Sequence, residues 1–233
     1  MVCRRLIANS GTYFNRRESE AQVKFFVAIA GNIGVGKSTL TDRLSARLDW
    51  KPYYEDVVDN PYLSDFYGDM ERWSFHSQVF FLARRLRHHH QLLNHNTSVV
   101  QDRTIYEDAE VFAENLYRQG TLVERDYRTY RDMYEALIQY LPPPDLVIYL
   151  KSSVDTLKQR IRLRGRDYER GIETTYLERL NHIYNDWIDS LTLCPVLTLP
   201  ADDLDFVQHN DHLDLIEARV VDRLRGKEEV VFD

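Results

Sequence analysis

The stretch from Gly31 to Ser38 reads GNIGVGKS, and these residue types at this spacing can bind phosphate. It fits the pattern G-x-x-x-x-G-K-[ST], in which glycines let backbone N–H groups surround phosphate oxygens, the lysine reaches the β- and γ-phosphates, and the hydroxyl binds Mg²⁺. We therefore predict that this loop binds the phosphates of ATP. The predicted ATP contacts are Gly31, Asn32, Ile33, Gly34, Val35, Gly36, Lys37, Ser38 and Thr39.

The sequence on either side of the loop supports this prediction. Residues 25–30 form a short apolar run of strand length, and Leu40, Leu44 and Leu48 recur at the spacing of one helical face. A strand therefore enters the loop and a helix leaves it, which directs the positive end of the helix dipole at the anion. A glycine-rich turn that matches the pattern by chance is the alternative.

The rest of the chain alternates apolar runs with helical patterns. The further strands that we predict are 51–54, 98–101, 145–150 and 195–199. The further helices start near 62 and span 73–93, 107–117, 124–141, 154–163, 174–190 and 211–225. This alternation is typical of an α/β fold with a five-stranded parallel sheet and helices on both faces. Ligands of such sheets bind outside the carboxyl ends of the strands, so we expect the loop, Glu55, Asp102 and Arg103 in one site.

The charged residues near these strand ends suit phosphoryl transfer, which needs positioning, a metal, a proton acceptor and cations for the developing charge. Lys37 would hold the donor phosphates, Ser38 and Asp102 would bind Mg²⁺, and Glu55 would accept the proton of the acceptor hydroxyl. The arginines that would neutralise the moving phosphoryl group are Arg103, Arg160, Arg164 and Arg166. The last three lie around Gly165, as in a mobile lid that closes over ATP.

Some of these assignments have simpler alternatives. Glu55 alone suits a helix N-cap or a surface carboxylate, and the arginines at 160–166 also suit a solvated helix face. The tract His88-His89-His90 predicts a polar helix face, because consecutive helical residues point about 100° apart and cannot share one metal ion as i, i+4 histidines do.

Composition narrows the class of protein. The 233 residues carry a net charge of −7 and are 43% hydrophobic, and their two cysteines show no metal or redox spacing. The negative charge argues against general nucleic-acid binding, and no apolar run approaches the ~18 residues of a membrane span. We expect a single cytoplasmic domain at residues 23–233, preceded by a flexible extension at residues 1–22.

Five motifs occur in an order that resembles a known family. They are GNIGVGKS at 31–38, YED and DNPYL within 54–63, WSFHSQ at 73–78, DRTIYED at 102–108 and RGRDYE at 164–169. The chain resembles the deoxynucleoside kinases over residues 25–206, and especially the bacterial deoxyadenosine-type members. The resemblance implies a P-loop kinase fold with an arginine-rich lid, ATP with Mg²⁺ as phosphate donor, and a homodimer. It further implies phosphorylation of the 5′-hydroxyl of a deoxynucleoside in nucleoside salvage, with no nucleic-acid or membrane partner.

The resemblance also implies roles for single residues at the reacting centre. Glu55 matches the general base that activates the 5′-hydroxyl, Arg103 matches the arginine beside that base, and Asp102 matches the acidic residue that acts on magnesium. The pair Asp205-Phe206 matches the loop that holds the adenine of the donor, although this loop is one residue longer here than in the deoxycytidine type.

The implied acceptor site lies on other motifs. Tyr67 and Glu169 match the pair that binds the 3′-hydroxyl. The implied contacts to the base are Gln78, Phe81, Arg85, Asp108 and Phe112. Gln78 and Arg85 are seven residues apart, so both project from one helical face. Phe81 narrows the space beside the base without deciding which base fits, whereas the pair of Arg85 and Asp108 argues against a thymidine specialist. We expect deoxyadenosine as the substrate, followed by deoxyguanosine or deoxycytidine.

Two other functions remain as alternatives. A nucleoside monophosphate kinase of the thymidylate type has a similar loop and lid, but it needs cations for an acceptor phosphate, whereas Tyr67 and Glu169 suit hydroxyls. A nucleotide-binding regulatory switch would carry a water-positioning residue and a switch glycine after an Asp-ended strand. Here Asp102 is followed by Arg103, so that pattern is absent.

Overall fold

A computed structural model of the chain describes residues 24–54 and 60–226. Within this part of the chain, no helix combines the length and the apolar character that crossing a bilayer requires. The predicted extension at residues 1–22 and Glu55 lie outside the described residues.

The centre of the fold is a five-stranded parallel sheet, as predicted, and its strand order is β2-β3-β1-β4-β5. Its strands are β1 (Phe26–Gly31), β2 (Lys51–Tyr53), β3 (Val99–Asp102), β4 (Leu146–Lys151) and β5 (Val196–Pro200). Every residue of β1 is buried, and so is every residue of β4 except Lys151, which explains why these two strands read as continuous apolar runs rather than as alternating ones. β1 lies in the middle of the sheet, so the loop that follows it opens at the centre of the carboxyl edge.

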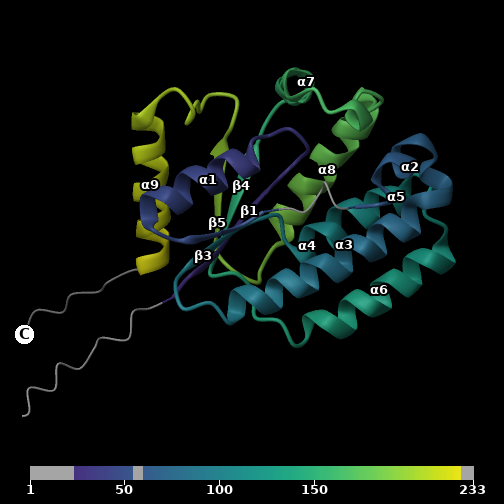
Figure 1. Ribbon diagram of the computed structural model, residues 1–233, viewed down its shortest axis with the longest axis horizontal. Helices are drawn as coiled ribbons and strands as arrows, with labels where there is room; N and C mark the ends of the chain where they lie inside the picture. The colour runs from purple at the N-terminus through teal and green to yellow at the C-terminus, as the bar shows by residue number, and fades with distance from the viewer. Residues whose placement is uncertain (1–23, 55–59, 227–233) are drawn as a thin grey trace, which may run out of the picture.

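Helices cover both faces of this sheet (Figure 1). Their bounds are α1 Lys37–Leu48, α2 Leu63–Gly68, α3 Met70–Leu93, α4 Ile105–Glu107, α5 Glu114–Arg118, α6 Glu124–Ile138, α7 Val154–Arg164, α8 Thr174–Ser190 and α9 Asn210–Arg225. α1 packs on β1, β2 and β3, and α9 packs beside α1 and against β5. α3, α5, α6 and α8 lie on the opposite side of the sheet (Figure 1).

The helix predicted at 107–117 is the element that differs most from its expected form. It begins earlier, because Thr104 and Glu107 form a capping box at the N-terminus of α4. After α4 the chain forms a π-helix, η1 (Asp108–Ala113), before α5 continues the helical path. A π-turn inserts one residue into the helix and is frequent at functional sites.

The histidine tract lies on α3, and the prediction of a polar face is wrong for its middle residue. His90 is exposed and His88 is half-buried, whereas His89 is buried with its ring edge-on to Phe26 of β1, the ring centroids 5.4 Å apart. Burial lowers the pKa of His89 to about 4, although the backbone carbonyl of Pro142 opposes this shift. The described residues contain no cluster of His, Cys, Asp and Glu side chains that would hold a metal ion.

We expect His89 to make the folded protein sensitive to acid. Its pKa of about 4 lies below the 6.5 of an exposed histidine, so the protein is stabilised by keeping the ring neutral. This contribution is complete above pH 6.5 and is lost as the pH falls toward 4, by on the order of 2 kcal/mol between pH 7 and pH 5. Urea unfolding at both pH values should show a smaller loss for His89→Phe than for the wild type. An identical loss in both proteins would contradict the assignment.

Candidate active site

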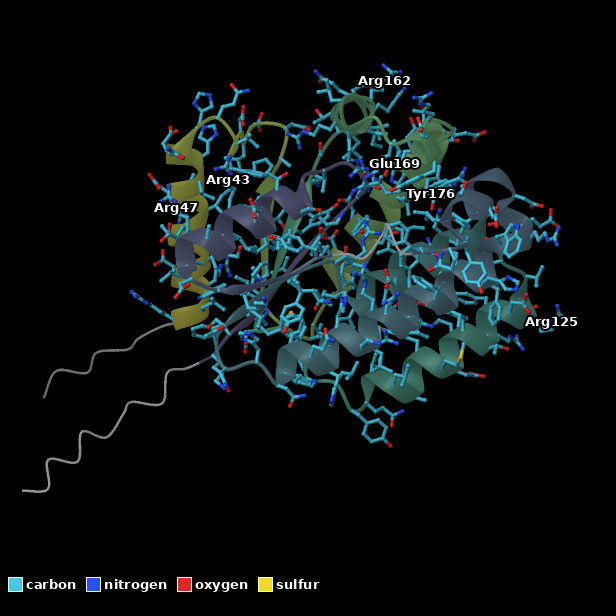
Figure 2. The ribbon with its side chains drawn as sticks, in the orientation of Figure 1. Arg43, Arg47, Arg125, Arg162, Glu169 and Tyr176 are labelled. Atoms are coloured by element: carbon cyan, nitrogen blue, oxygen red, sulfur yellow. The ribbon has the colours of Figure 1, made fainter. Side chains whose placement is uncertain are left out.

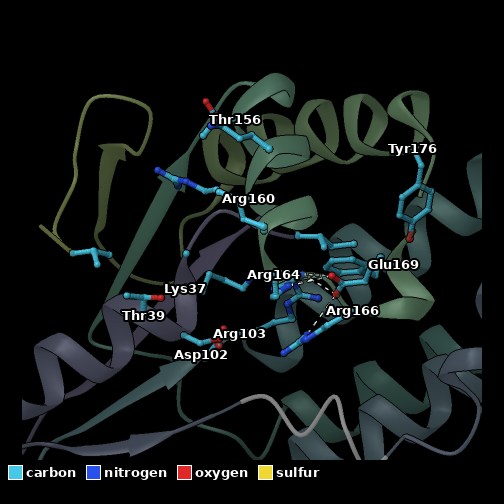
Figure 3. Close-up of a pocket in the computed structure, with 18 of the residues that line it drawn as sticks. Lys37, Thr39, Asp102, Arg103, Thr156, Arg160, Arg164, Arg166, Glu169 and Tyr176 are labelled. Carbon is cyan, nitrogen blue, oxygen red and sulfur yellow. Dashed lines mark hydrogen bonds and ion pairs between the residues drawn. The ribbon is translucent and has the colours of Figure 1, made fainter. Parts of the chain in front are cut away.

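A cleft of about 830 Å³ opens at the carboxyl edge of the sheet. The segments that follow β1, β3, β4 and β5 all contribute to its walls, together with α2, α3 and η1. The prediction that the loop, Asp102 and Arg103 meet in one site is therefore confirmed for the described residues. Figure 3 shows Asp102 and Arg103 below Arg164 and Glu169, with Lys37 beside Arg164.

Most residues of the predicted site line this cleft. They are Ile33, Gly34, Gly36, Lys37, Ser38, Thr39, Tyr67, Gln78, Phe81, Asp102, Arg103, Asp108, Phe112, Arg160, Arg164, Arg166, Glu169, Asp205 and Phe206. Four others that the structure describes do not line it: Gly31, Asn32, Val35 and Arg85. These four are buried or lie at the end of a strand, where they support the cleft from behind.

The phosphate loop is closely packed against its surroundings. The Nζ of Lys37 donates to the carbonyl oxygens of Gly31, at 2.8 Å, and Asn32, at 3.1 Å, so the ammonium lies over the loop. Gly34 has a φ of +82°, and a Cβ there would lie 2.7 Å from Cγ1 of Ile161 on α7. Only glycine fits this position, because any side chain would be strained and would push the loop away from α7.

Ser38 and Asp102 lie together at the start of α1 and the end of β3. The Ser38 hydroxyl donates to Oδ2 of Asp102 at 2.5 Å. Oδ1 of Asp102 is buried and has no hydrogen-bond partner among the described residues. A hydroxyl and a carboxylate are the hard oxygen ligands that Mg²⁺ prefers, so this pair fits the predicted metal site.

Arg103 follows β3 in an unusual backbone conformation. Its φ is +64°, a left-handed value that costs of order 1–3 kcal/mol for a residue other than glycine and that clusters at active sites. Its backbone N–H donates to the carbonyl of Ile29 at 3.0 Å. Its guanidinium lies 4.1 Å from the centre of the Phe112 ring, which η1 places on the cleft wall. The strained turn therefore directs the cation into the cleft beside Asp102.

Another part of the cleft carries the predicted contacts to a base. Gln78 on α3 is 3% exposed, and its Oε1 has no hydrogen-bond partner among the described residues. Arg85 lies two turns along the same helix and donates from Nε to Oδ2 of Asp108 at 3.0 Å. Arg85 also reaches the backbone carbonyl of Asp102 at 3.5 Å, which explains why it lies behind the cleft and why only Asp108 lines it.

The basic segment at residues 160–166 begins on α7 and contributes Arg160, Arg164 and Arg166 to the lining of the cleft. Arg164 forms a bidentate pair with Glu169, whose two carboxylate oxygens each lie 2.7 Å from its Nη2, and Arg166 reaches the same carboxylate at 3.4 Å. In Figure 2, Glu169 lies on the inner side of this segment, whereas Arg162 points outward. Tyr168 stacks on Tyr67 of α2, with ring centroids 6.0 Å apart, and joins this segment to the opposite wall.

Arg160 lines the cleft and also bonds to two loops of the chain. Its Nη1 donates to the carbonyl of Val35 at 2.7 Å, and its Nη2 donates to the carbonyl of Ala201 at 2.8 Å. It thus joins the phosphate loop to the loop after β5. In that second loop the backbone N–H groups of Gln208 and Val207 lower the pKa of Asp205, to which both donate at 3.0 Å.

Sequence reasoning missed several residues that line the cleft. The main ones are Leu63, Phe66, Tyr168, Tyr176 and Asp202. Tyr168 lies within the motif RGRDYE, so that motif contained the signal for it. Tyr176 lies on α8, whose sequence has an ordinary helical pattern, so no motif indicated that this residue would line the cleft. Burial raises the pKa of Tyr176 to about 12, so its hydroxyl keeps its proton at neutral pH and can donate a hydrogen bond.

Comparison with known proteins identifies the family to which the chain belongs. The family model described as deoxynucleoside kinase matches residues 27–224, which is most of the chain. The chain belongs to the deoxynucleoside kinase family. It is therefore a phosphotransferase, which agrees with the phosphate loop and favours a kinase over the regulatory switch or the monophosphate kinase considered above.

Individual deoxynucleoside kinases resemble the chain over most of its length. It is 41% identical over 192 residues to a deoxyadenosine/deoxycytidine kinase of Bacillus subtilis, which covers 82% of this chain and 88% of that protein. It is 35% identical over 199 residues to a deoxyguanosine kinase of the same organism, covering 84% of this chain and 95% of the other. The deoxyadenosine kinase of M. mycoides with bound dATP superposes with a TM-score of 0.76 at 31% identity, covering 85% of this chain and all of that one.

Proposed function

We propose that the protein transfers the γ-phosphate of ATP to the 5′-hydroxyl of a purine deoxynucleoside, first of all deoxyadenosine, in nucleoside salvage. The buried amide of Gln78 carries this proposal, because a buried acceptor without a partner among the described residues costs free energy unless a ligand satisfies it. An amide donates and accepts at once, which matches the paired groups on the edge of adenine. Relatives that act on deoxyadenosine support this choice over thymidine.

The donor side of the proposal rests on the phosphate loop. Its backbone N–H groups and the dipole of α1 suit the β- and γ-phosphates, with Lys37 turning from the loop carbonyls to the phosphate oxygens. The loop after β5, including Asp205 and Phe206, lies along the same cleft and suits the adenine of ATP. Mg²⁺, held by Ser38 and Asp102, would supply charge neutralisation at the phosphates.

The acceptor side uses the opposite part of the cleft. Tyr67 and Glu169 would bind the 3′-hydroxyl, and Phe112 would stack on the base opposite Phe81. Glu55, which follows β2, would accept the 5′-hydroxyl proton, and Arg103 would neutralise the charge of the moving phosphoryl group. We propose that Arg164 and Arg166 close on the phosphates once Glu169 has exchanged them for the sugar hydroxyl.

Phosphorylation assays with ATP and each of the four deoxynucleosides test this proposal, with the four 5′-monophosphates as competing acceptors. We expect turnover of deoxyadenosine ahead of deoxyguanosine and deoxycytidine, and none of the monophosphates. Turnover of thymidine ahead of the other three would reject the purine assignment. Turnover of a monophosphate alone would make the protein a nucleotide kinase.

We expect Gln78→Ala to act on the choice of nucleoside rather than on the chemical step. The variant removes both hydrogen bonds to the base edge, so kcat/KM for the preferred nucleoside should fall on the order of 10- to 100-fold, while KM for ATP stays unchanged. Steady-state kinetics with each deoxynucleoside measures this. Gln91→Ala is the matched control, because Gln91 lies on α3 too but is exposed and outside the cleft. Equal preference in variant and wild type would show that Gln78 does not recognise the base.

The homodimer remains a prediction from the family resemblance, and the cytoplasmic location remains a prediction from the use of cysteine. Light scattering on the purified protein tests the first of them directly.

A further inference from the structure

Glu107, the last residue of α4, is a buried carboxyl group for which the mechanism above has no use. It is completely buried, and its two oxygens accept hydrogen bonds from three different parts of the chain. Oε1 accepts from the backbone N–H of Gly31 at 3.3 Å and from the hydroxyl of Tyr184 on α8 at 2.9 Å. Oε2 accepts from the backbone N–H of Thr104 at 3.0 Å. All these contacts come from donors, the arrangement that suits a carboxylate.

The contact with Gly31 acts where β1 becomes the phosphate loop. Gly31 has a φ of +146°, and a Cβ there would lie 2.8 Å from the carbonyl of Leu150, so its backbone is confined on that side. Lys37 donates to the carbonyl of the same residue at 2.8 Å. Glu107 therefore holds the N–H of the residue whose carbonyl orients Lys37.

The contact with Thr104 acts on the strained turn at Arg103. The backbone N–H of Arg103 donates to the carbonyl of Ile29. The backbone N–H of the next residue, Thr104, donates to the carboxylate of Glu107. A left-handed arginine persists only where its surroundings hold it in place. Glu107 is one of the groups that do so.

The carboxylate of Glu107 also attracts the positively charged side chains of Arg103 and Lys37. Burial raises the pKa of Glu107, whereas Arg103 and Lys37 oppose that shift, which means that both cations lie close enough to attract its carboxylate. A carboxyl group without exposure to water costs stability unless it is fully satisfied. An apolar residue would avoid this cost, but it would leave the backbone N–H groups of Gly31 and Thr104 without this acceptor, so the carboxyl group serves both segments at once.

We infer that Glu107 is a positioning residue that holds the phosphate loop and the Arg103 turn in fixed relation, so that Lys37 and Arg103 meet the transferring phosphoryl group together. It touches neither substrate, since it does not line the cleft. Its effect on turnover rests on the proposed function, whereas its effect on the phosphate loop does not depend on which acceptor is used.

Three variants test this inference. Glu107→Gln keeps the size of the side chain but places an amide N–H₂ against one of the donors, so one contact is lost in either orientation. Glu107→Asp keeps the charge but shortens the side chain by one methylene. Tyr184→Phe is the matched control, because it removes the third contact of the carboxylate and leaves both backbone contacts in place.

The melting temperature of each variant is measured first, and two further measurements are then made below it. The first is the equilibrium Kd of ATP by calorimetry without any acceptor, and the second is kcat with deoxyadenosine. For Glu107→Gln we expect kcat to fall about 10- to 100-fold and the Kd of ATP to rise about tenfold, because misplaced groups lose both binding and rate. Glu107→Asp should lie between this variant and the wild type. Tyr184→Phe should lower the melting temperature but leave both constants within about twofold of wild type.

Some outcomes would overturn the inference. If Glu107→Gln or Glu107→Asp lowers the melting temperature while kcat and the Kd of ATP stay as in the wild type, Glu107 only supports the fold. If Glu107→Gln does not fold, the melting temperature, kcat and Kd of ATP of Glu107→Asp decide between the two roles. Failure of the proposed function looks different, since the wild type would then bind ATP but phosphorylate no deoxynucleoside, and the ATP measurement would still test Glu107.

Discussion

Replacing Arg103 with glycine is expected to lower kcat roughly 10³- to 10⁵-fold, the range for an arginine that stabilises the charge of phosphoryl transfer. Glycine adopts the φ of +64° without strain, so the change removes the guanidinium and leaves the turn intact. The lost contact with Phe112 should cost stability only modestly, about 1 kcal/mol. Single-turnover kinetics at saturating ATP and deoxyadenosine separates the chemical step from product release.

Two further variants make this result specific. Arg103→Lys keeps a positive charge but not the fork of five donors, and it should recover only part of the rate. Arg131 provides the matched control, because it pairs with Glu110 of η1 at 3.0 Å and lies over the ring of Tyr134, outside the cleft. Arg131→Ala should therefore leave kcat unchanged. A glycine variant that turns over within tenfold of wild type would remove Arg103 from the chemical step.

Replacing Glu55 with glutamine should lower kcat roughly 10²- to 10⁴-fold, the range for loss of a general base. Glu55 lies outside the described residues, so this prediction rests on the sequence and on β2, which ends at Tyr53. β2 runs parallel to β3, so the chain leaves both strands at the same edge of the sheet. The affinity for ATP should stay the same, because the base acts on the acceptor.

Asp56→Asn is the control for this second experiment, since it removes the neighbouring carboxylate, for which we predict no role. The pH dependence of kcat/KM is the most informative measurement: the acidic limb of the wild-type profile should disappear in Glu55→Gln and persist in Asp56→Asn. Unchanged turnover of Glu55→Gln would show that another group accepts the proton.

The sheet and the phosphate loop were predictable because their signals are local. Residues 25–30 form an apolar run of strand length, and the GNIGVGKS pattern after them has one known geometry. Because Asp102 and Arg103 come at the end of a predicted strand, their place in the cleft could be predicted without any knowledge of side-chain contacts. These predictions needed only the rule that parallel strands end at one edge.

The orientation of single side chains was not predictable, because contacts between distant segments decide it. Arg160 donates hydrogen bonds to the carbonyl oxygens of Val35 and Ala201, which are 125 and 41 residues away in the sequence. No local sequence pattern indicates that its guanidinium forms these bonds. His89 is buried because α3 turns it toward Phe26, not because of its neighbours in sequence. The π-turn in η1 was missed for the same reason, since the sequence pattern there is that of an ordinary helix.

The central place of β1 also affects how the protein is made. β1 pairs with β3 and with β4, and its first backbone N–H donates to the side chain of Asp145, 119 residues further along the chain. At about 5–20 residues per second, a ribosome reaches Asp145 roughly 6 to 24 s after Phe26. During that time the strand that carries the phosphate loop lacks at least one of its two neighbours, and it lacks both until β3 is made, so the growing chain cannot bind ATP as the finished protein does. Such long-range pairing also slows folding, and it leaves an apolar strand with an unpaired edge, which is prone to aggregation, until β4 is made.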